Sequence, residues 1–184
     1  MAIINYLVNF GLFYGVWIIC LYGVVDGAAW WGPAATLGTL FIYLVLERHR
    51  WKEDIIIFNS LLAVGLLHDS LMASSGFIQY RGYLWLPTFL CPEWILGIWG
   101  LFALTLNRSM VWMRRYPPLA FLCGAFGGVL SYLAGERVGV IEFPFSYLTS
   151  IICLGLIWGL LFPLLLWYAH YVELLLSPEN PKTK

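Results

Sequence analysis

Hydrophobic residues in this chain form long runs that only short polar or charged segments interrupt. A helix needs about 20 mostly apolar residues to cross the hydrocarbon core of a bilayer, and six runs come close to that length. We expect helices at residues 3–25, 28–46, 55–78, 93–113, 119–135 and 145–171. The runs do not alternate apolar and polar residues, so they predict helices and not the strands of a β-barrel.

The connecting segments are short, which favours a single transmembrane domain over residues 1–176, followed by a short cytoplasmic tail at residues 177–184. Several prolines fall at or near the proposed helix ends, where a missing N–H costs least. Pro163 lies inside the last run instead, and we expect it to kink that helix. The pattern therefore predicts an all-α integral membrane protein, built as a bundle of six transmembrane helices.

Composition narrows the class of protein further. Of the 184 residues, 61% are hydrophobic and 11% are charged, whereas an ordinary soluble domain is about 25% charged. A soluble chain of this size could not bury so much apolar surface, which excludes soluble enzymes, nucleic-acid-binding domains and disordered tails. The formal net charge is zero, so charge indicates no polyanionic partner such as nucleic acid.

The basic residues gather at one end of the proposed bundle. Eight of the ten lie in the second loop, the fourth loop and the tail: Arg48, Arg50, Lys52, Arg108, Arg114, Arg115, Lys182 and Lys184. The opposite loops contain only Arg81 and Arg137. Since cytoplasmic loops carry the excess of Lys and Arg, we expect both termini in the cytoplasm and an even number of spans.

One ionisable pair lies inside a predicted span. An ionisable side chain at membrane depth is costly and marks a candidate functional group. His68 and Asp69 lie within the third run, and Ser70, Ser74 and Ser75 follow, so we expect this stretch to line a polar cavity. Neighbouring helical residues point about 100° apart, which lets one of the pair face the cavity while the other bonds to a neighbouring helix. The alternative is a purely structural polar clamp between helices.

Four further carboxylates join Asp69 in the outer half of the bundle under this orientation: Asp26, Glu93, Glu136 and Glu142. Desolvation and mutual repulsion raise the pKa of clustered carboxylates, and a carboxylic acid that stays protonated can act as a general acid. The predicted catalytic residues are Asp69, His68, Glu93 and Glu136. The predicted substrate-binding residues are Arg137, Arg81, Ser74 and Asn9. The alternative is that the interfacial acids only cap helix ends or form solvated ion pairs.

Small residues form two rows on the fifth predicted helix. One row contains Ala120, Gly124 and Gly128, and the other contains Gly127, Ser131 and Gly135. Small residues let membrane helices approach closely, so we expect this helix at the centre of the bundle, and the rows also suit a homo-oligomer. The four cysteines stand alone, without metal-ligand spacing, and the sequence predicts neither a metal site nor a cofactor.

Three segments together resemble a known family: residues 93–115 (EWILGIWGLFALTLNRSMVWMRR), residues 127–139 (GGVLSYLAGERVG) and the helix with His68 and Asp69. The family consists of uncharacterised, small proteobacterial inner-membrane proteins and carries only a "domain of unknown function" label. It has His in place of Arg108, so a role for that position stays open. The resemblance implies a multi-pass protein of the bacterial inner membrane. Family members are often encoded near genes resembling cyclopropane-fatty-acid synthases, which suggests lipid modification by association alone.

These observations lead to one functional hypothesis and two alternatives. The first is a protein that acts on or binds a lipid or isoprenoid by acid–base chemistry, in a polar cavity that faces the outer leaflet between the third, fourth and fifth helices. The second is a non-catalytic membrane scaffold or subunit for a soluble lipid-modifying enzyme, and the third is a small transporter. The expected partners are membrane lipids and such an enzyme.

Overall fold

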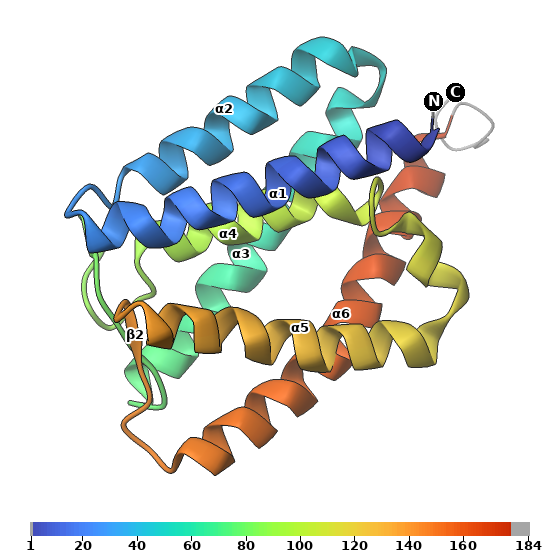
Figure 1. Cartoon of the computed structure of the whole chain (residues 1–184). Coiled ribbons are helices and arrows are strands. Elements are labelled where there is room, and N and C mark those ends of the chain that lie inside the picture. Colours follow the sequence, from blue (N-terminus) through green and yellow to red (C-terminus); the bar gives the residue numbers. More distant parts are fainter. Residues whose placement is uncertain (1, 178–184) are drawn as a thin grey trace.

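The computed structural model describes residues 2–177, so the predicted tail with Lys182 and Lys184 lies outside the described residues. Six α-helices follow one another in this part of the chain: α1 (Ala2–Val25), α2 (Trp31–Leu46), α3 (Trp51–Ser74), α4 (Glu93–Leu106), α5 (Pro117–Arg137) and α6 (Tyr147–Leu176) (Figure 1). The 3-10 helices η1 (Arg48–Arg50) and η2 (Val111–Arg115) precede α3 and α5. Two short strands, β1 (Gln79–Tyr80) and β2 (Ile141–Glu142), form an antiparallel pair.

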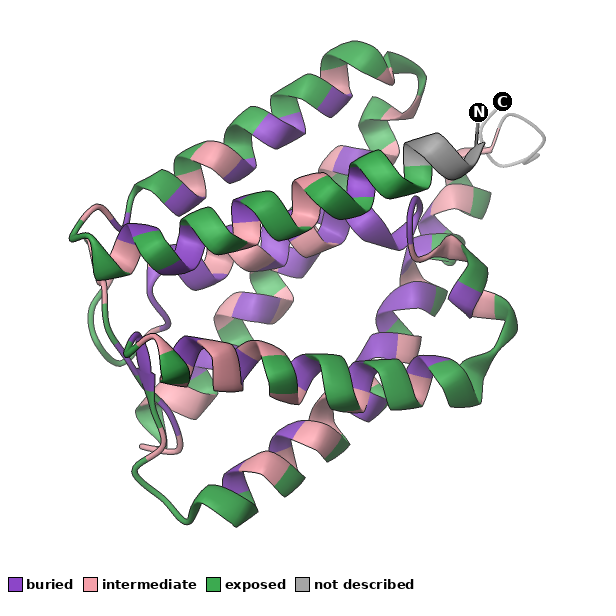
Figure 2. Ribbon diagram, viewed as in Figure 1, coloured by how far each residue is buried: buried purple, intermediate pink, exposed green. Residues whose placement is uncertain are grey.

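The all-α prediction is confirmed for the described residues. Four helical segments are long and apolar enough to cross a membrane: Tyr6–Val25, Arg48–Ser74, Pro117–Arg137 and Tyr147–Leu176. The helices α2 and α4 have 16 and 14 residues, or about 24 and 21 Å at 1.5 Å per residue. Many large apolar residues are exposed, and exposed positions recur along α1, α2, α5 and α6 (Figure 2), which fits an all-α membrane protein.

The bounds of the third helix differ from the prediction. The helix was expected at residues 55–78 but begins at Trp51 and ends at Ser74. The charged residues at its start can join it because Asp54 is buried against Arg108, 2.9 Å away. The chain then turns at Gly76, whose φ of 70° lies in the left-handed region that favours glycine.

The fourth helix is shorter than predicted, and the others differ by a few residues. It was expected at residues 93–113 but ends at Leu106. The chain turns there because the N–H groups of Arg108 and Met110 both bond to the carbonyl of Thr105. The remaining helices start or end at most five residues from the expected bounds. Pro163 lies inside α6 as expected, and α6 changes direction in Figure 1.

The central helix is α4, so the prediction of a central fifth helix is wrong. Ten of the 14 residues of α4 are buried, and it packs against α1, α2 and α3. By contrast, α5 packs mainly along α6. The close approach expected from its first small-residue row does occur there, because a Cβ added at Gly124 would lie 2.4 Å from the carbonyl oxygen of Trp158.

The molecule therefore has two helical parts. The first comprises α1 to α4, and the second is the α5–α6 hairpin. At one end η2 connects them, and at the other the β1–β2 pair joins the loop after α3 to the loop after α5. In Figure 1, α1 and α5 run across the view one above the other. The space between these two helices holds the candidate site.

Candidate functional site

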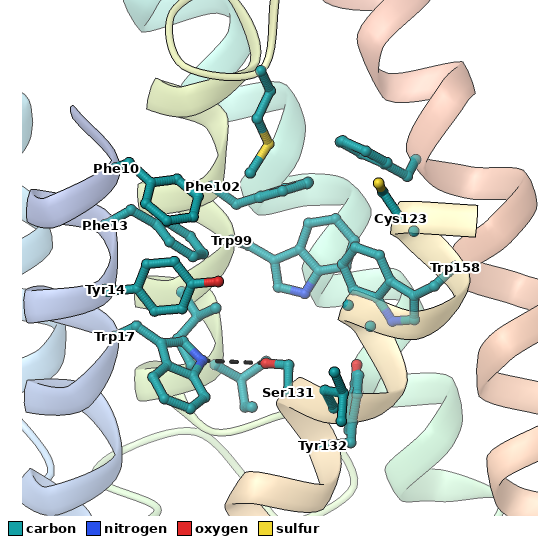
Figure 3. A pocket seen from close by; sticks show the side chains of 18 of the residues that line it. Phe10, Phe13, Tyr14, Trp17, Trp99, Phe102, Cys123, Ser131, Tyr132 and Trp158 are labelled. Atoms are coloured by element: carbon teal, nitrogen blue, oxygen red, sulfur yellow. Dashed lines mark hydrogen bonds between the residues drawn. The ribbon is translucent and has the colours of Figure 1, made fainter. Parts of the chain in front are cut away.

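A cavity of about 610 Å³ lies between α1, α4 and α5, within the range of roughly 300–1,000 Å³ that is typical of small-molecule sites. Eleven of its 24 lining residues are aromatic: Phe10, Phe13, Tyr14, Trp17, Trp94, Trp99, Phe102, Trp112, Tyr132, Trp158 and Phe162. Figure 3 shows the α1 side chains facing those of α5 and α6 across the cavity. This cavity differs from the expected polar cavity between the third, fourth and fifth helices, because its lining is mainly apolar and α3 contributes Asp69 alone to it.

The cavity is elongated along α1. Its lining on that helix extends from Phe10 to Leu21, eleven residues apart, which is about 16 Å at the helical rise. On the other part of the molecule it continues from Cys123 to Tyr132 on α5 and includes Trp158 of α6. The shape suits a long, narrow ligand better than a compact one.

A single side-chain hydrogen bond is described between α1 and α5. The indole N–H of Trp17 donates to the hydroxyl of Ser131 over 3.2 Å (Figure 3). Ser131 belongs to the second small-residue row, together with Gly127, where an added Cβ would have no atom within 4 Å. Gly127 therefore borders open space, whereas a Cβ added at Gly135 of the same row would lie 2.7 Å from Ile141. The hydroxyl of Tyr14 also points into the cavity (Figure 3).

Asp69 forms part of the cavity wall and accepts three hydrogen bonds. Its Oδ1 accepts from the hydroxyls of Tyr80, at 2.7 Å, and Tyr132, at 2.5 Å. Its Oδ2 accepts from the indole N–H of Trp99 at 2.6 Å. All three partners can donate, and hydrogen bonds to an ionised carboxylate are about twice as strong as neutral ones. Asp69 thereby connects α3 to β1, α4 and α5.

His68 belongs to the same group, which we call the Asp69 cluster (His68, Asp69, Tyr80, Trp99 and Tyr132). Its Nδ1 lies 3.3 Å from Oδ2 of Asp69, and its ring packs against the indole rings of Trp99 and Trp158, with centroids 5.8 and 5.9 Å away. It is not among the lining residues of the cavity. Of the two adjacent residues, Asp69 therefore faces the cavity and His68 fills the space behind the wall.

The loop behind the cluster keeps its ionisable groups in the protonated form. Burial, with Asp69 nearby, raises the pKa of the Cys91 thiol to about 12, so the thiol is not a nucleophile at neutral pH. Burial and the neighbouring carboxylate likewise raise the pKa of the Tyr80 hydroxyl, which keeps it a hydrogen-bond donor. Among the described residues, no three His, Cys, Asp or Glu side chains could together hold a metal ion.

Glu93 holds a loop in place. It is the first residue of α4, and its carboxylate accepts the backbone N–H groups of Leu84, Trp85 and Leu86 at 3.0, 2.7 and 2.7 Å. These bonds satisfy N–H groups of a segment without regular structure, which would otherwise lack partners where water is scarce. Glu93 thus anchors the loop before α4 and lies outside the cavity lining.

The remaining outer residues of the predicted site also lie outside the cavity lining. Arg81 forms an exposed ion pair with Glu142, and the exposed Ser74 donates to the carbonyl of Leu71. Glu136 and Arg137 occupy the last turn of α5. Within the described part of the chain, neither of their side chains takes part in an ion pair or hydrogen bond.

A second buried charged group lies at the opposite end of the bundle, and we call it the Arg108 cluster (Glu47, Asp54 and Arg108). Both terminal nitrogens of Arg108 donate to the carboxylate of Asp54 at 2.9 Å, and its Nε donates to Glu47 at 3.1 Å. The guanidinium carbon lies 4.2 Å from the ring centroid of Tyr43. Sequence reasoning missed this cluster, although Asp54 directly precedes an apolar run.

Asn9 belongs to the same end of the molecule. Its amide donates to the hydroxyl of Tyr43 at 2.7 Å and to the carbonyl of Leu104 at 3.1 Å. Its Oδ1 accepts from the hydroxyl of Ser109 at 2.6 Å. Asn9 therefore fastens α1 to α2 and α4, and it is not among the cavity-lining residues.

The aromatic wall was also missed from the sequence, although a signal exists. Phe10, Tyr14 and Trp17 on α1 are three or four residues apart, which places them on one helix face, and Phe13 lies next to them. A predominantly aromatic face within a membrane span can serve as packing or as a binding wall. Only the position of the opposite helix separates these two possibilities.

Comparison with known proteins adds a family but no activity. A family described as "Protein of unknown function (DUF2878)" matches residues 6–164 of the chain, a range that includes every residue lining the cavity. No curated protein and no solved structure matches. The expected membership of an uncharacterised family is confirmed to this extent, and any function has to be argued from the site.

Proposed function

The chain belongs to the DUF2878 family, whose description states no function, and we propose that the protein binds a single lipid or isoprenoid chain within the membrane. The proposal rests on one observation. This is the aromatic cavity of about 610 Å³ between α1, α4 and α5. The helices around it are apolar on their outward faces, so a chain dissolved in the bilayer could reach it laterally.

The size of the cavity favours a ligand with one hydrocarbon chain over a lipid with two. A water molecule occupies about 30 Å³ in the liquid, so the space corresponds to roughly 20 groups of methylene size. A single chain of about that number of carbons fits, whereas a phospholipid with two chains would leave most of its bulk outside. An extended chain of that many carbons is longer than the distance of about 16 Å along α1, so it would bend within the cavity or project from it.

Contacts with the aromatic wall can make binding of such a ligand more favourable than its solution in the bilayer. Lipid tails are as apolar as the cavity, so the hydrophobic effect does not separate the two environments. Binding must instead gain from close dispersion contacts with fixed walls, each small and together large. The stacked Trp99 and Trp158, with ring centroids 5.1 Å apart, provide a flat and rigid surface for this purpose.

In this proposal the chain crosses the bacterial inner membrane six times, with the Arg108 end toward the cytoplasm and the Asp69 end toward the outer leaflet. The clustering of cations at the Arg108 end supports that orientation. The short α4 is compatible with six spans because it is enclosed by protein, and irregular backbone is tolerated at membrane depth where protein surrounds it. Both termini are then cytoplasmic.

A catalytic version of the proposal assigns proton transfer on the bound chain to Asp69 and His68. Its support is the position of Asp69 in the cavity wall, 3.3 Å from His68. Because both oxygens of Asp69 already accept hydrogen bonds, binding is the function that the site favours. A non-catalytic scaffold that presents the chain to a soluble enzyme would use the same cavity.

The test compares two glycine variants in purified, detergent-solubilised full-chain protein. Gly127→Leu places a side chain in the cavity without a clash at its Cβ, and the control, Gly15→Leu, adds the same side chain to an open position on α1 outside the lining. The probe is dibrominated octadecane, whose bromines quench the fluorescence of the tryptophans in the wall. We expect Gly127→Leu to raise the probe concentration that gives half-maximal quenching by about tenfold. Gly15→Leu should leave this concentration unchanged.

Two outcomes contradict the proposal. Equal quenching in wild type and both variants would mean that the bromines act from the detergent phase. A probe-resistant dimer, dissociated by Gly127→Leu and detected by size-exclusion chromatography with light scattering, would mean that a second copy of the chain fills the cavity.

A further inference from the structure

The electrostatic character of the cavity is unusual for a lipid site. Asp69 is its one carboxylate, and no Lys, Arg or His occurs among its lining residues, all of which lie in the described part of the chain. The nearest imidazole, His68, lies behind the wall. Arg108 and Arg81 contact other acidic side chains, Asp54 and Glu142. A ligand in this cavity therefore lies near one carboxylate, which is itself fully buried and has the imidazole of His68 3.3 Å away, and it contacts no Lys, Arg or His side chain of the lining.

We propose that the occupant is a neutral single-chain lipid that ends in a hydroxyl or carbonyl group, and that the cavity rejects anionic lipids. The inference rests on the proposed function and adds the class of ligand to it. A phosphate or carboxylate head would bring a second negative charge close to Asp69 in a medium of low dielectric constant, where repulsion between like charges is strong. An unpaired buried ion also loses its hydration without compensation.

A cationic head is disfavoured for a different reason. An ammonium group has three donors, and each needs an acceptor once water is removed. The oxygens of Asp69 already accept from Tyr80, Tyr132 and Trp99, and the residue has no exposed surface. The remaining lining offers hydroxyl groups, which compensate an ammonium poorly for its lost hydration.

Uncharged partners for a small polar group are present in the same wall. Ser131 accepts from Trp17 and keeps its own O–H for a ligand acceptor. Tyr132 donates to Asp69, so its oxygen can accept from a ligand donor. The Tyr14 hydroxyl points into the cavity (Figure 3) and makes no hydrogen bond within the described part of the chain. A hydroxyl can use both kinds of partner, and a carbonyl can use the donors.

The test uses competition among amphiphiles with one chain length and different heads. Full-chain protein in nanodiscs of zwitterionic lipid is loaded with dibrominated octadecane and titrated with hexadecanol, hexadecyl phosphate or hexadecylamine, with recovery of tryptophan fluorescence as the readout. We expect hexadecanol to displace the probe at about one tenth of the concentration that hexadecyl phosphate requires. Ser131→Ala should weaken the binding of hexadecanol about fivefold more than it weakens the binding of dibrominated octadecane, because only hexadecanol loses a hydrogen bond.

Asp69→Asn tests the source of the selectivity. Removing the charge should bring the apparent affinities for hexadecyl phosphate and hexadecanol within about threefold of each other, because the repulsive charge is gone. The control is Asp26→Asn, at an exposed position in the turn after α1, which should preserve the tenfold difference. Ser131→Ala keeps the proposal testable if Asp69→Asn does not fold.

The outcomes separate the inference from the proposed function. If dibrominated octadecane does not bind the wild-type protein, the proposed function fails. If it binds, equal or tighter binding of hexadecyl phosphate overturns the charge selection. If hexadecylamine binds most tightly of the three, the inference of a neutral ligand is overturned, and Asp69 is the counter-ion of a cationic head group. Hexadecane has the same chain as hexadecanol but lacks the hydroxyl group. If hexadecanol displaces the probe no better than hexadecane does, the hydrogen-bonding end of the site is refuted.

Discussion

Asp54 and Asp69 are both buried carboxylates on α3, but their partners differ. Asp54 accepts two hydrogen bonds from the guanidinium of Arg108, whereas Asp69 accepts from the uncharged donors of Tyr80, Tyr132 and Trp99. The first arrangement places a cation directly against the carboxylate. The second distributes one negative charge over neutral groups, and two of them, Tyr132 and Trp99, also line the cavity.

The difference separates a cluster inside one helical part from a cluster beside the cavity to which we assign the proposed ligand. The Arg108 cluster joins the segments around α2, α3 and α4 within one helical part, away from the cavity wall. The Asp69 cluster connects that part to α5 of the hairpin through Tyr132, and it leaves its charge next to an open space. The basic neighbour of Asp69 is the His68 imidazole, 3.3 Å from its Oδ2, and not a guanidinium, and the place of Asp69 beside the cavity supports the proposed role in selecting the ligand.

Arg108→Met is expected to cause the largest loss of unfolding free energy. The variant leaves Asp54 and Glu47 buried or half-buried without their cation, and breaking a buried pair in this way costs about 4 kcal/mol of unfolding free energy. The measurement is an SDS titration followed by circular dichroism. Arg115→Met is the control, because Arg115 is exposed and its loss should change the free energy by less than about 0.5 kcal/mol. Similar values for both variants would show that the Arg108 cluster is not structural.

Asp69→Asn should have a smaller effect on the same measurement. The amide still accepts at one oxygen, and no ion is left unpaired, so we expect a loss of about 2.5 kcal/mol from weakened charge-assisted bonds. The exposed Asp26→Asn should be neutral within about 0.5 kcal/mol. A loss as large as that of Arg108→Met would remove the distinction between the two clusters.

The smallest effect is expected from Tyr80→Phe. Asp69 keeps Tyr132 and Trp99 as donors, so the loss should be about 1.5 kcal/mol, the lower end for a bond to a charged group. Tyr132→Phe should lose a similar amount but should also weaken hexadecanol binding, since only Tyr132 of the two lines the cavity. Tyr22→Phe, at an exposed position, is the control. If Tyr80→Phe also weakens hexadecanol binding, the stabilisation of Asp69 and the binding of the ligand are not separate roles.

The prediction from sequence worked where a property is local. A helix in a membrane follows from a run of apolar residues, and six such runs correspond to the six described helices. Asp69 was recognisable because a charge inside an apolar run is costly wherever the helix packs. The helix ends were less accurate: Asp54 was expected before the third helix but lies in the first turn of α3, where it pairs with Arg108.

The tertiary structure alone decided the site. Asp54 and Arg108 are separated by 54 residues, and Trp17 and Ser131 by 114, so no local pattern reveals their contacts. The two glycine rows of α5 are similar in sequence, yet a Cβ at Gly128 would meet Trp158 while one at Gly127 would meet nothing. Apolar composition determines that helices form in a membrane, whereas the fit of particular side chains determines which faces meet and which leave a cavity.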